Sequence, residues 1–263
     1  MRRTGSLTAV LTCVGLLVSP AAGDAGPQRI TLQTAFAPDR LRTPTTIQFG
    51  FHVLSANPGQ VPSPVTKMSL DLPAGMGLAT STLGLAQCPP ATLIEQGLAG
   101  CPASAQVGIG TAEAEMRVEH EILDESATVH ALLGPPAGEN EQVLFYVEAI
   151  TPVGAQFVFP GVILPASGRY SGRLDTTIPL IPTWSEGPNV SVTSFSSTIG
   201  PRGLTYYRHL KDRFVPFHPR GIAVPAHCPR GGFPFRADFT FLDRTRATAT
   251  SAVPCPAPHP FGR

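Results

Sequence analysis

Apolar and polar residues alternate with a period of two along much of the chain. In residues 47–53, for example, Ile47, Phe49 and Phe51 alternate with polar or small residues. Such alternation is typical of a β-strand that buries one face. It predicts further strands in residues 67–72, 112–118, 127–134, 142–150, 155–164, 169–178 and 189–199. Turn residues separate several of these stretches, and strands spaced by about ten residues are found in β-sandwiches and β-barrels.

The clearest hairpin lies near the C-terminal end. Phenylalanines at every second position of residues 233–241 share one face, and Asp243 and Arg244 form the expected turn. The return strand places Ala247 and Ala249 in phase, so bulky rings can pack beside small partners. Another stretch, residues 155–164, is apolar on both faces. It is therefore either a central buried strand or, because it contains Pro160, an edge strand.

The most distinctive local pattern runs through residues 85–113. Cys88 and Cys101 are each followed by proline and bracket residues 91–97, which read as one or two helical turns begun by proline and ended by glycine. We interpret the stretch as a disulfide-stabilised connection between strands.

Together these patterns favour an all-β fold. We expect residues 26–263 to form an immunoglobulin-like β-sandwich in the broad sense, with about ten strands and one short helical segment bracketed by a disulfide. Two smaller sandwiches, divided near residues 179–188, are the alternative. Between residues 200 and 229 the sequence predicts a loop-like region.

The first residues have the features of a signal peptide. Arg2 and Arg3 precede a short apolar run at residues 6–18, and small residues follow, which predicts a leader at residues 1–25. The apolar run is shorter than the roughly 20 residues that span a bilayer, and no later stretch is long enough. We therefore expect an exported protein, extracellular or at the cell surface, with no membrane span after the leader is removed.

Removal of the leader leaves four cysteines, Cys88, Cys101, Cys228 and Cys255. An even number in an oxidising compartment predicts disulfides, for which three pairings exist. Proximity in sequence favours Cys88 with Cys101 and Cys228 with Cys255. Free thiols are the alternative, and no spacing typical of zinc ligands is present.

The net charge and the arrangement of reactive residues argue against several functions. The formal net charge of +1 gives no basis for nucleic-acid binding. An acidic run in residues 113–125, which includes Asp124 and Glu125, is read as solvated surface. His209, His218 and His227 are spaced too widely for familiar metal sites. No Gly-x-Ser-x-Gly elbow occurs, so we expect no catalytic residues, no metal and no cofactor.

One segment combines aromatic and cationic residues. We expect it to be a binding loop, because aromatic rings and cations together can stack on sugars or hold an acidic polymer. Its alternative role is to cap one end of the sandwich. The residues that carry the hypothesis are Tyr206, Tyr207, Arg208, Lys211 and Arg213.

The segment from Cys101 to Gly108, followed by Gly110, resembles a Cys-Pro-x-x-Ser-x-x-Gly motif of uncharacterised exported actinobacterial β-rich proteins. Later blocks, among them Cys228-Pro229 and residues 233–241, follow the same order as in that group. One departure is that Ala105 stands at the serine position, with Ser104 before it. The resemblance implies export, a β-rich fold and paired cysteines, and it implies no activity.

Two hypotheses about function follow. In the first, the protein is an exported, non-catalytic binding or structural protein of the cell envelope or extracellular space, whose partner is an envelope polymer or a surface protein. In the second, it is an exported hydrolase whose site assembles only in the fold. A concave pocket with converging His, Ser or carboxylate groups would favour the second.

Overall fold

The computed structural model describes residues 28–37, 39–78, 86–151, 154–181, 189–200, 206–217 and 222–256. The expected leader at residues 1–25 lies outside this part of the chain. The elements, in chain order, are β1 (Arg29–Ala37), β2 (Pro44–Leu54), β3 (Val65–Pro73), β4 (Gly77–Leu78), α2 (Pro90–Gln96), η1 (Gly97–Gly100), η2 (Ala103–Ala105), β5 (Gln106–Val118), β6 (Glu121–Leu133), β7 (Glu141–Thr151), β8 (Ala155–Pro165), β9 (Tyr170–Thr177), β10 (Ser191–Ile199), β11 (Tyr206–Leu210), β12 (Arg213–Phe217), β13 (Ile222–Ala223), β14 (Phe233–Phe241) and β15 (Arg246–Val253).

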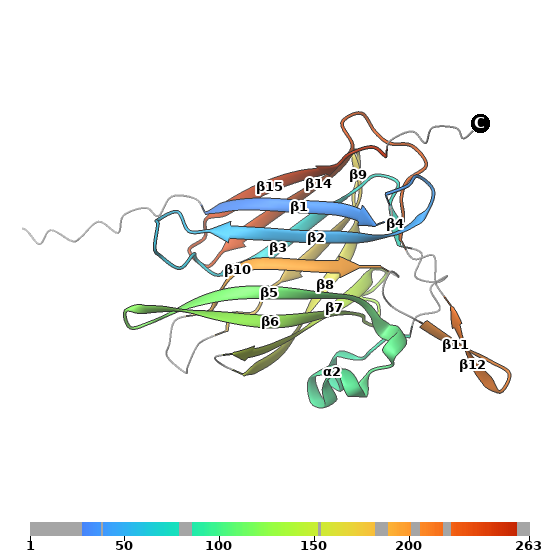
Figure 1. Cartoon of the computed structure of the whole chain (residues 1–263), viewed down its shortest axis with the longest axis horizontal. Coiled ribbons are helices and arrows are strands. Elements are labelled where there is room, and N and C mark those ends of the chain that lie inside the picture. Colours follow the sequence, from blue (N-terminus) through green and yellow to red (C-terminus); the bar gives the residue numbers. More distant parts are fainter. Residues whose placement is uncertain are drawn as a thin grey trace, which may run out of the picture.

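The strands form a nearly closed barrel, and the expectation of an immunoglobulin-like sandwich is wrong. Eleven of the described strands pair in one antiparallel sheet, in the order β1-β2-β10-β5-β6-β7-β8-β9-β3-β14-β15. The sheet curls until its first and last strands lie side by side (Figure 1). There the hydroxyl of Thr34 in β1 donates to Ser251 Oγ in β15 at 3.0 Å. No backbone ladder joins β1 to β15 in the described residues, so the barrel keeps one seam.

Alternation alone cannot distinguish the two architectures, because strands of a sandwich and of a barrel both bury one face. The difference lies in strand order. Strand β10 lies between β2 and β5, and β3 lies between β9 and β14, so pairings distant in sequence close the sheet. Strands on both sides of residues 179–188 belong to this one sheet. Strand β8 pairs with β7 and β9, which makes it an inner strand of the sheet despite Pro160.

Close approach of β5 and β10 requires glycine. A Cβ atom at Gly110 would lie 2.3 Å from the backbone oxygen of Ser196. Only a residue without a side chain fits there, and glycine within a strand is commonly found where a sheet bends or another backbone approaches closely.

The C-terminal hairpin is confirmed. Strands β14 and β15 pair with Phe239 opposite Ala247 and Ala237 opposite Ala249, and a turn at Arg244 joins them. The four phenylalanines of β14 are at most 1 % exposed. Phe239 packs edge-on against Phe51 of β2, with ring centroids 5.0 Å apart. The hairpin therefore supplies much of the aromatic core on this side of the barrel.

Two segments differ from the expectation. Strand β1 has no counterpart in the expected elements, although Leu32 and Phe36 face the core. The polar Thr34 between them interrupts the apolar alternation. In the region expected to be a loop, β11 and β12 form a two-stranded hairpin that is separate from the barrel sheet. Figure 1 shows this hairpin projecting from the barrel.

Both expected disulfides and the short helix are confirmed. Cys88 bonds to Cys101 and Cys228 to Cys255, with Cα atoms 5.3 and 5.7 Å apart. Such bonds are consistent with an oxidising compartment outside the cytoplasm. Helix α2 begins with Pro90 and ends before Gly97, whose φ is +62°. Its fully buried Leu93 packs with side chains of β6 and β7, so this disulfide-linked element covers part of the barrel's outer face.

We expect that replacing Cys88 by serine lowers the free energy of unfolding by about 2–3 kcal/mol, because the loop of the unfolded chain is no longer closed. Urea denaturation followed by circular dichroism measures the change. The variant should also gain one thiol, at Cys101, that reacts with a maleimide. Unchanged stability, or a Cys101 that stays unreactive in the unfolded variant, would show that the two cysteines are not bonded to each other.

Candidate functional site

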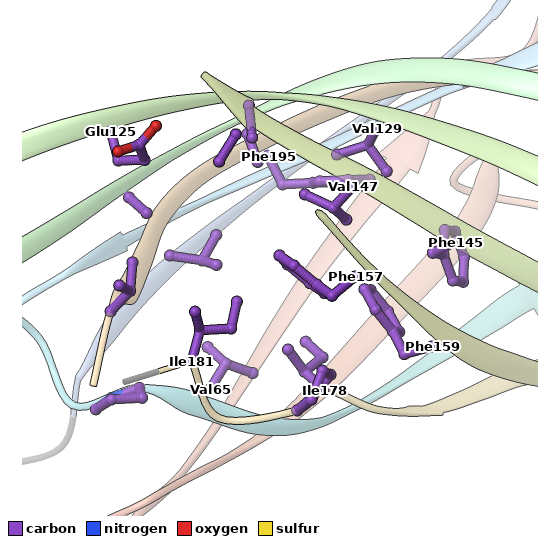
Figure 2. A pocket seen from close by; sticks show the side chains of 18 of the residues that line it. Val65, Glu125, Val129, Phe145, Val147, Phe157, Phe159, Ile178, Ile181 and Phe195 are labelled. Carbon is purple, nitrogen blue, oxygen red and sulfur yellow. The ribbon is translucent and has the colours of Figure 1, made fainter. Parts of the chain in front are cut away.

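The barrel contains an apolar cavity of about 150 Å³ between the inner faces of its strands (Figure 2). Side chains from β2, β3 and β5 to β10 line it, together with residues 179–181. The space exists because inward positions here carry alanine, whereas phenylalanine fills the interior beside β14. The alanines that line the cavity are Ala112, Ala114, Ala127, Ala149 and Ala155.

Aromatic rings form one wall of the cavity. Phe145 of β7 stacks on Phe159 of β8 with centroids 5.2 Å apart, and Phe157 stacks on Phe159 at 6.0 Å. In Figure 2 these three rings follow one another along one side of the cavity. Flat rings held in a row present a continuous apolar surface to any molecule that enters.

The walls include one carboxyl group, that of Glu125 in β6. Glu125 is only 4 % exposed and lies opposite Ala114 of β5 on the inner face. The other polar lining residue is Thr176, whose hydroxyl donates to the backbone oxygen of Pro160 at 2.9 Å. Glu125 is therefore the single ionisable side chain among the described residues that line the cavity.

This placement corrects the interpretation of the acidic run as surface. Glu113, which is exposed, accepts a hydrogen bond from the Ser126 hydroxyl at 2.7 Å, as expected for an outward position. Glu125 instead falls in phase with Ala127 and Val129, two apolar residues of the same strand. That phase is visible in the sequence, and it is the signal that could have identified the buried carboxyl group.

One end of the cavity lies beside the end of β9. Leu180 lines the cavity and is nevertheless 41 % exposed, and the neighbouring Pro179 is exposed as well. Ile181, which follows, is half-buried and points towards the cavity in Figure 2.

A second cavity, of about 240 Å³, lies at the opposite ends of the same strands. Its walls include Pro165, which is exposed, and Glu141, which is half-buried. The Ser171 hydroxyl in its wall lies 2.8 Å from the backbone oxygen of Pro73 and 2.9 Å from that of Met76. The walls of the first cavity are almost entirely apolar, whereas those of the second include Glu141 and Ser171. We therefore regard the first cavity as the better candidate site.

The expected binding loop lies elsewhere. Tyr206, Tyr207 and Arg208 belong to β11, Lys211 lies in the turn and Arg213 begins β12. Lys211 and Arg213 are exposed. No described wall of the cavity comes from this hairpin, so its binding role stays a prediction separate from the cavity.

The three histidines form no metal centre that the structure describes. His209 is in β11, His227 is exposed, and His218 lies outside the described residues. No group of three His, Cys, Asp or Glu residues suited to a metal ion occurs in the described ranges.

A polar cluster on the outer face of the barrel is the other concentration of titratable groups. Tyr146 and Gln156 each donate a hydrogen bond of 3.1 Å to Glu148, and His130 Nε2 lies 3.9 Å from that carboxylate. Burial lowers the pKa of His130, and the Glu148 charge partly offsets this effect. These bonds connect β6, β7 and β8 beside α2, so the cluster stabilises this part of the sheet.

The fold and the cavity define a class of protein, an all-β barrel with an apolar cavity whose described walls include one buried carboxyl group. No protein-family model, curated protein or solved structure matches this chain. None of the helices in the described ranges is long and apolar enough to cross a membrane.

Proposed function

We propose that the protein is an exported, non-catalytic binding protein that holds a small apolar molecule in the barrel cavity. The observation that carries the proposal is the cavity of about 150 Å³ lined by alanine and phenylalanine side chains. An apolar cavity of this size is large enough for a benzene-sized molecule. Small-molecule sites are typically concave and mostly apolar, with few polar groups.

The energetics of the core support this assignment. Interiors of proteins are normally close-packed, and a cavity of this size costs on the order of 3 kcal/mol of stability relative to a filled core. Larger residues at the alanine positions would recover part of that energy. A core that is not filled in this way is suited to a ligand, because a bound apolar molecule restores the missing contacts.

Other hypotheses have less support. A hydrolase needs a nucleophile and a base that converge, whereas the described cavity walls contribute one carboxyl group and one hydroxyl that already donates within the wall. Contact of the β11–β12 hairpin with an envelope polymer or a surface protein is compatible with the cavity proposal. Export is supported by the two disulfides and by the leader pattern.

Toluene is a suitable probe. We expect toluene to bind the disulfide-bonded protein and to raise its melting temperature, since a ligand that binds only the folded state stabilises it. Replacement of Ala127 by leucine should reduce toluene affinity at least tenfold, because the added side chain occupies the cavity. Isothermal calorimetry and thermal denaturation measure both effects.

The matched control is Ala252→Leu, the same change at an exposed alanine of β15 that does not line the cavity. This variant should bind toluene as the unaltered protein does. The proposal fails if toluene does not bind the unaltered protein, or if Ala127→Leu and Ala252→Leu bind it equally well.

A further inference from the structure

We infer that the molecule held in the cavity contains one aromatic ring, which lies on a row of alanine residues between two groups of phenylalanine side chains. The inference rests on the proposed function and specifies the class of ligand. It follows from the strand register, from the positions of the phenylalanine rings and from the other side chains in the walls.

The strand register aligns small residues across the cavity. Direct cross-strand partners on β2, β10, β5, β6, β7 and β8 form one continuous row, which consists of Phe51, Phe195, Ala112, Ala127, Ala149 and Ala155. All six residues line the cavity. The four alanines, which we call the alanine row, therefore form a shallow apolar surface on four adjacent strands, and a flat ring can lie on it.

Phenylalanine rings lie at both ends of the alanine row. At the β10 end, Phe51 and Phe195 stack with their ring centroids 5.5 Å apart. At the β8 end, Phe157 is the next lining residue of β8 after Ala155, and its ring stacks on Phe159. A molecule on the alanine row therefore has aromatic neighbours in two directions.

These neighbours favour an aromatic ligand over a saturated one. Aromatic rings attract each other in offset-stacked and edge-to-face arrangements, and such pairs contribute more than the burial of their area accounts for. Met68 and Met116 also line the cavity, and a thioether sulfur makes favourable contacts with the edge of an aromatic ring. A saturated ring gains only from the burial of its apolar area.

Toluene and methylcyclohexane separate the two classes of ligand, because each consists of one six-membered ring and one methyl group. The cavity volume of about 150 Å³ has room for about one such ring. We expect the unaltered, disulfide-bonded protein to bind toluene about three- to tenfold more tightly than methylcyclohexane. Area burial alone predicts the opposite order, since the saturated molecule has more apolar surface. Headspace gas chromatography over the protein solution measures both affinities, and the ranking does not depend on whether a variant folds.

The variant Phe157→Leu removes one ring and keeps the residue apolar. It should weaken toluene binding about three- to tenfold and leave the affinity for methylcyclohexane nearly unchanged. If steric fit set the preference instead, the smaller leucine would tighten the binding of methylcyclohexane and leave that of toluene unchanged. Phe195→Leu, at the other end of the alanine row, should have the same effect as Phe157→Leu.

The matched control is Phe36→Leu, the same change at a buried phenylalanine of β1 that does not line the cavity. The ring of Phe36 packs edge-on against Phe233 of β14, with centroids 5.3 Å apart. Both affinities of this variant should equal those of the unaltered protein.

The outcomes distinguish the two proposals. Equal affinities for toluene and methylcyclohexane in the unaltered protein, or tighter binding of methylcyclohexane, would overturn the aromatic assignment and leave the apolar cavity proposal standing. The assignment would also be overturned if Phe157→Leu and Phe195→Leu both kept the full affinity for toluene, or if Phe36→Leu lost as much. Failure of both probes to bind the unaltered protein would instead remove the proposed function itself.

Discussion

Replacement of Phe239 by alanine is expected to lower the free energy of unfolding by about 3–5 kcal/mol, the range found for deletion of a buried phenylalanine side chain. The ring is 1 % exposed and packs edge-on against Phe51, which lies on β2 at the other side of the seam between β1 and β15. Its cross-strand neighbour on β15 is Ala247, which is too small to fill the space that the ring would leave. The variant should therefore lose apolar contact and leave a cavity.

Urea denaturation measures this loss. The matched control is Phe214→Ala in β12, because Phe214 is 71 % exposed and the same truncation at an exposed position should change stability by less than about 0.5 kcal/mol. A loss below about 1 kcal/mol for Phe239→Ala, or equal losses for both variants, would mean that the β14 face does not form the core as described.

The elements that could be predicted are those whose signals lie close together in the sequence. The β14–β15 hairpin was predictable because its period-two phenylalanines, its turn and its small return residues are all within one short segment. The same holds for α2, where proline begins the helix and Gly97 follows its end. The disulfide pairing followed from proximity along the chain, since short loops are the easiest to close.

The barrel could not be predicted in the same way, because strand order depends on contacts between distant segments. Residues of β3 are equally amphipathic whether β14 or another strand lies beside them. Strand β1 was missed since Thr34 interrupts its apolar face, and the structure shows why a polar residue is acceptable there. The Thr34 hydroxyl makes the contact across the seam to Ser251.

The candidate site was partly visible in the sequence. The phase of Glu125 with Ala127 and Val129 already places a carboxyl group on an apolar face. That phase is hard to recognise because neighbouring acidic residues of the same hairpin, such as Asp124, face outward. The cavity itself had no sequence signal, since alanines on β5, β6, β7 and β8 leave a common space only after these strands pair.

The outer face of the barrel contains a buried charge of a different kind, at Asp71 of β3. Asp71 is 2 % exposed and accepts two hydrogen bonds from Arg173 of β9, from Nε at 2.7 Å and from Nη2 at 3.2 Å. The two residues are direct cross-strand partners. The hydrogen bond to Asp71 and the charge of its carboxylate raise the pKa of the Arg173 guanidinium, so this arginine is a permanent cation.

Replacement of Arg173 by methionine should therefore lower the free energy of unfolding by about 3 kcal/mol. Removal of one partner of a buried ion pair leaves the other charge uncompensated, which costs about 3–5 kcal/mol. The lower end of that range applies because the Arg173 side chain is itself 43 % exposed. Chemical denaturation at pH 7 measures the change.

The control is Lys67→Met, which removes a lysine whose Nζ lies 3.9 Å from Asp175 and whose side chain is 52 % exposed. Such an exposed pair contributes less than about 1 kcal/mol. Adding Asp71→Leu to Arg173→Met should recover much of the loss, because the double variant no longer buries a lone carboxylate. If the double variant is less stable than Arg173→Met alone, the buried carboxylate is not the cause of the destabilisation and the loss comes from the packing of the arginine side chain against the sheet.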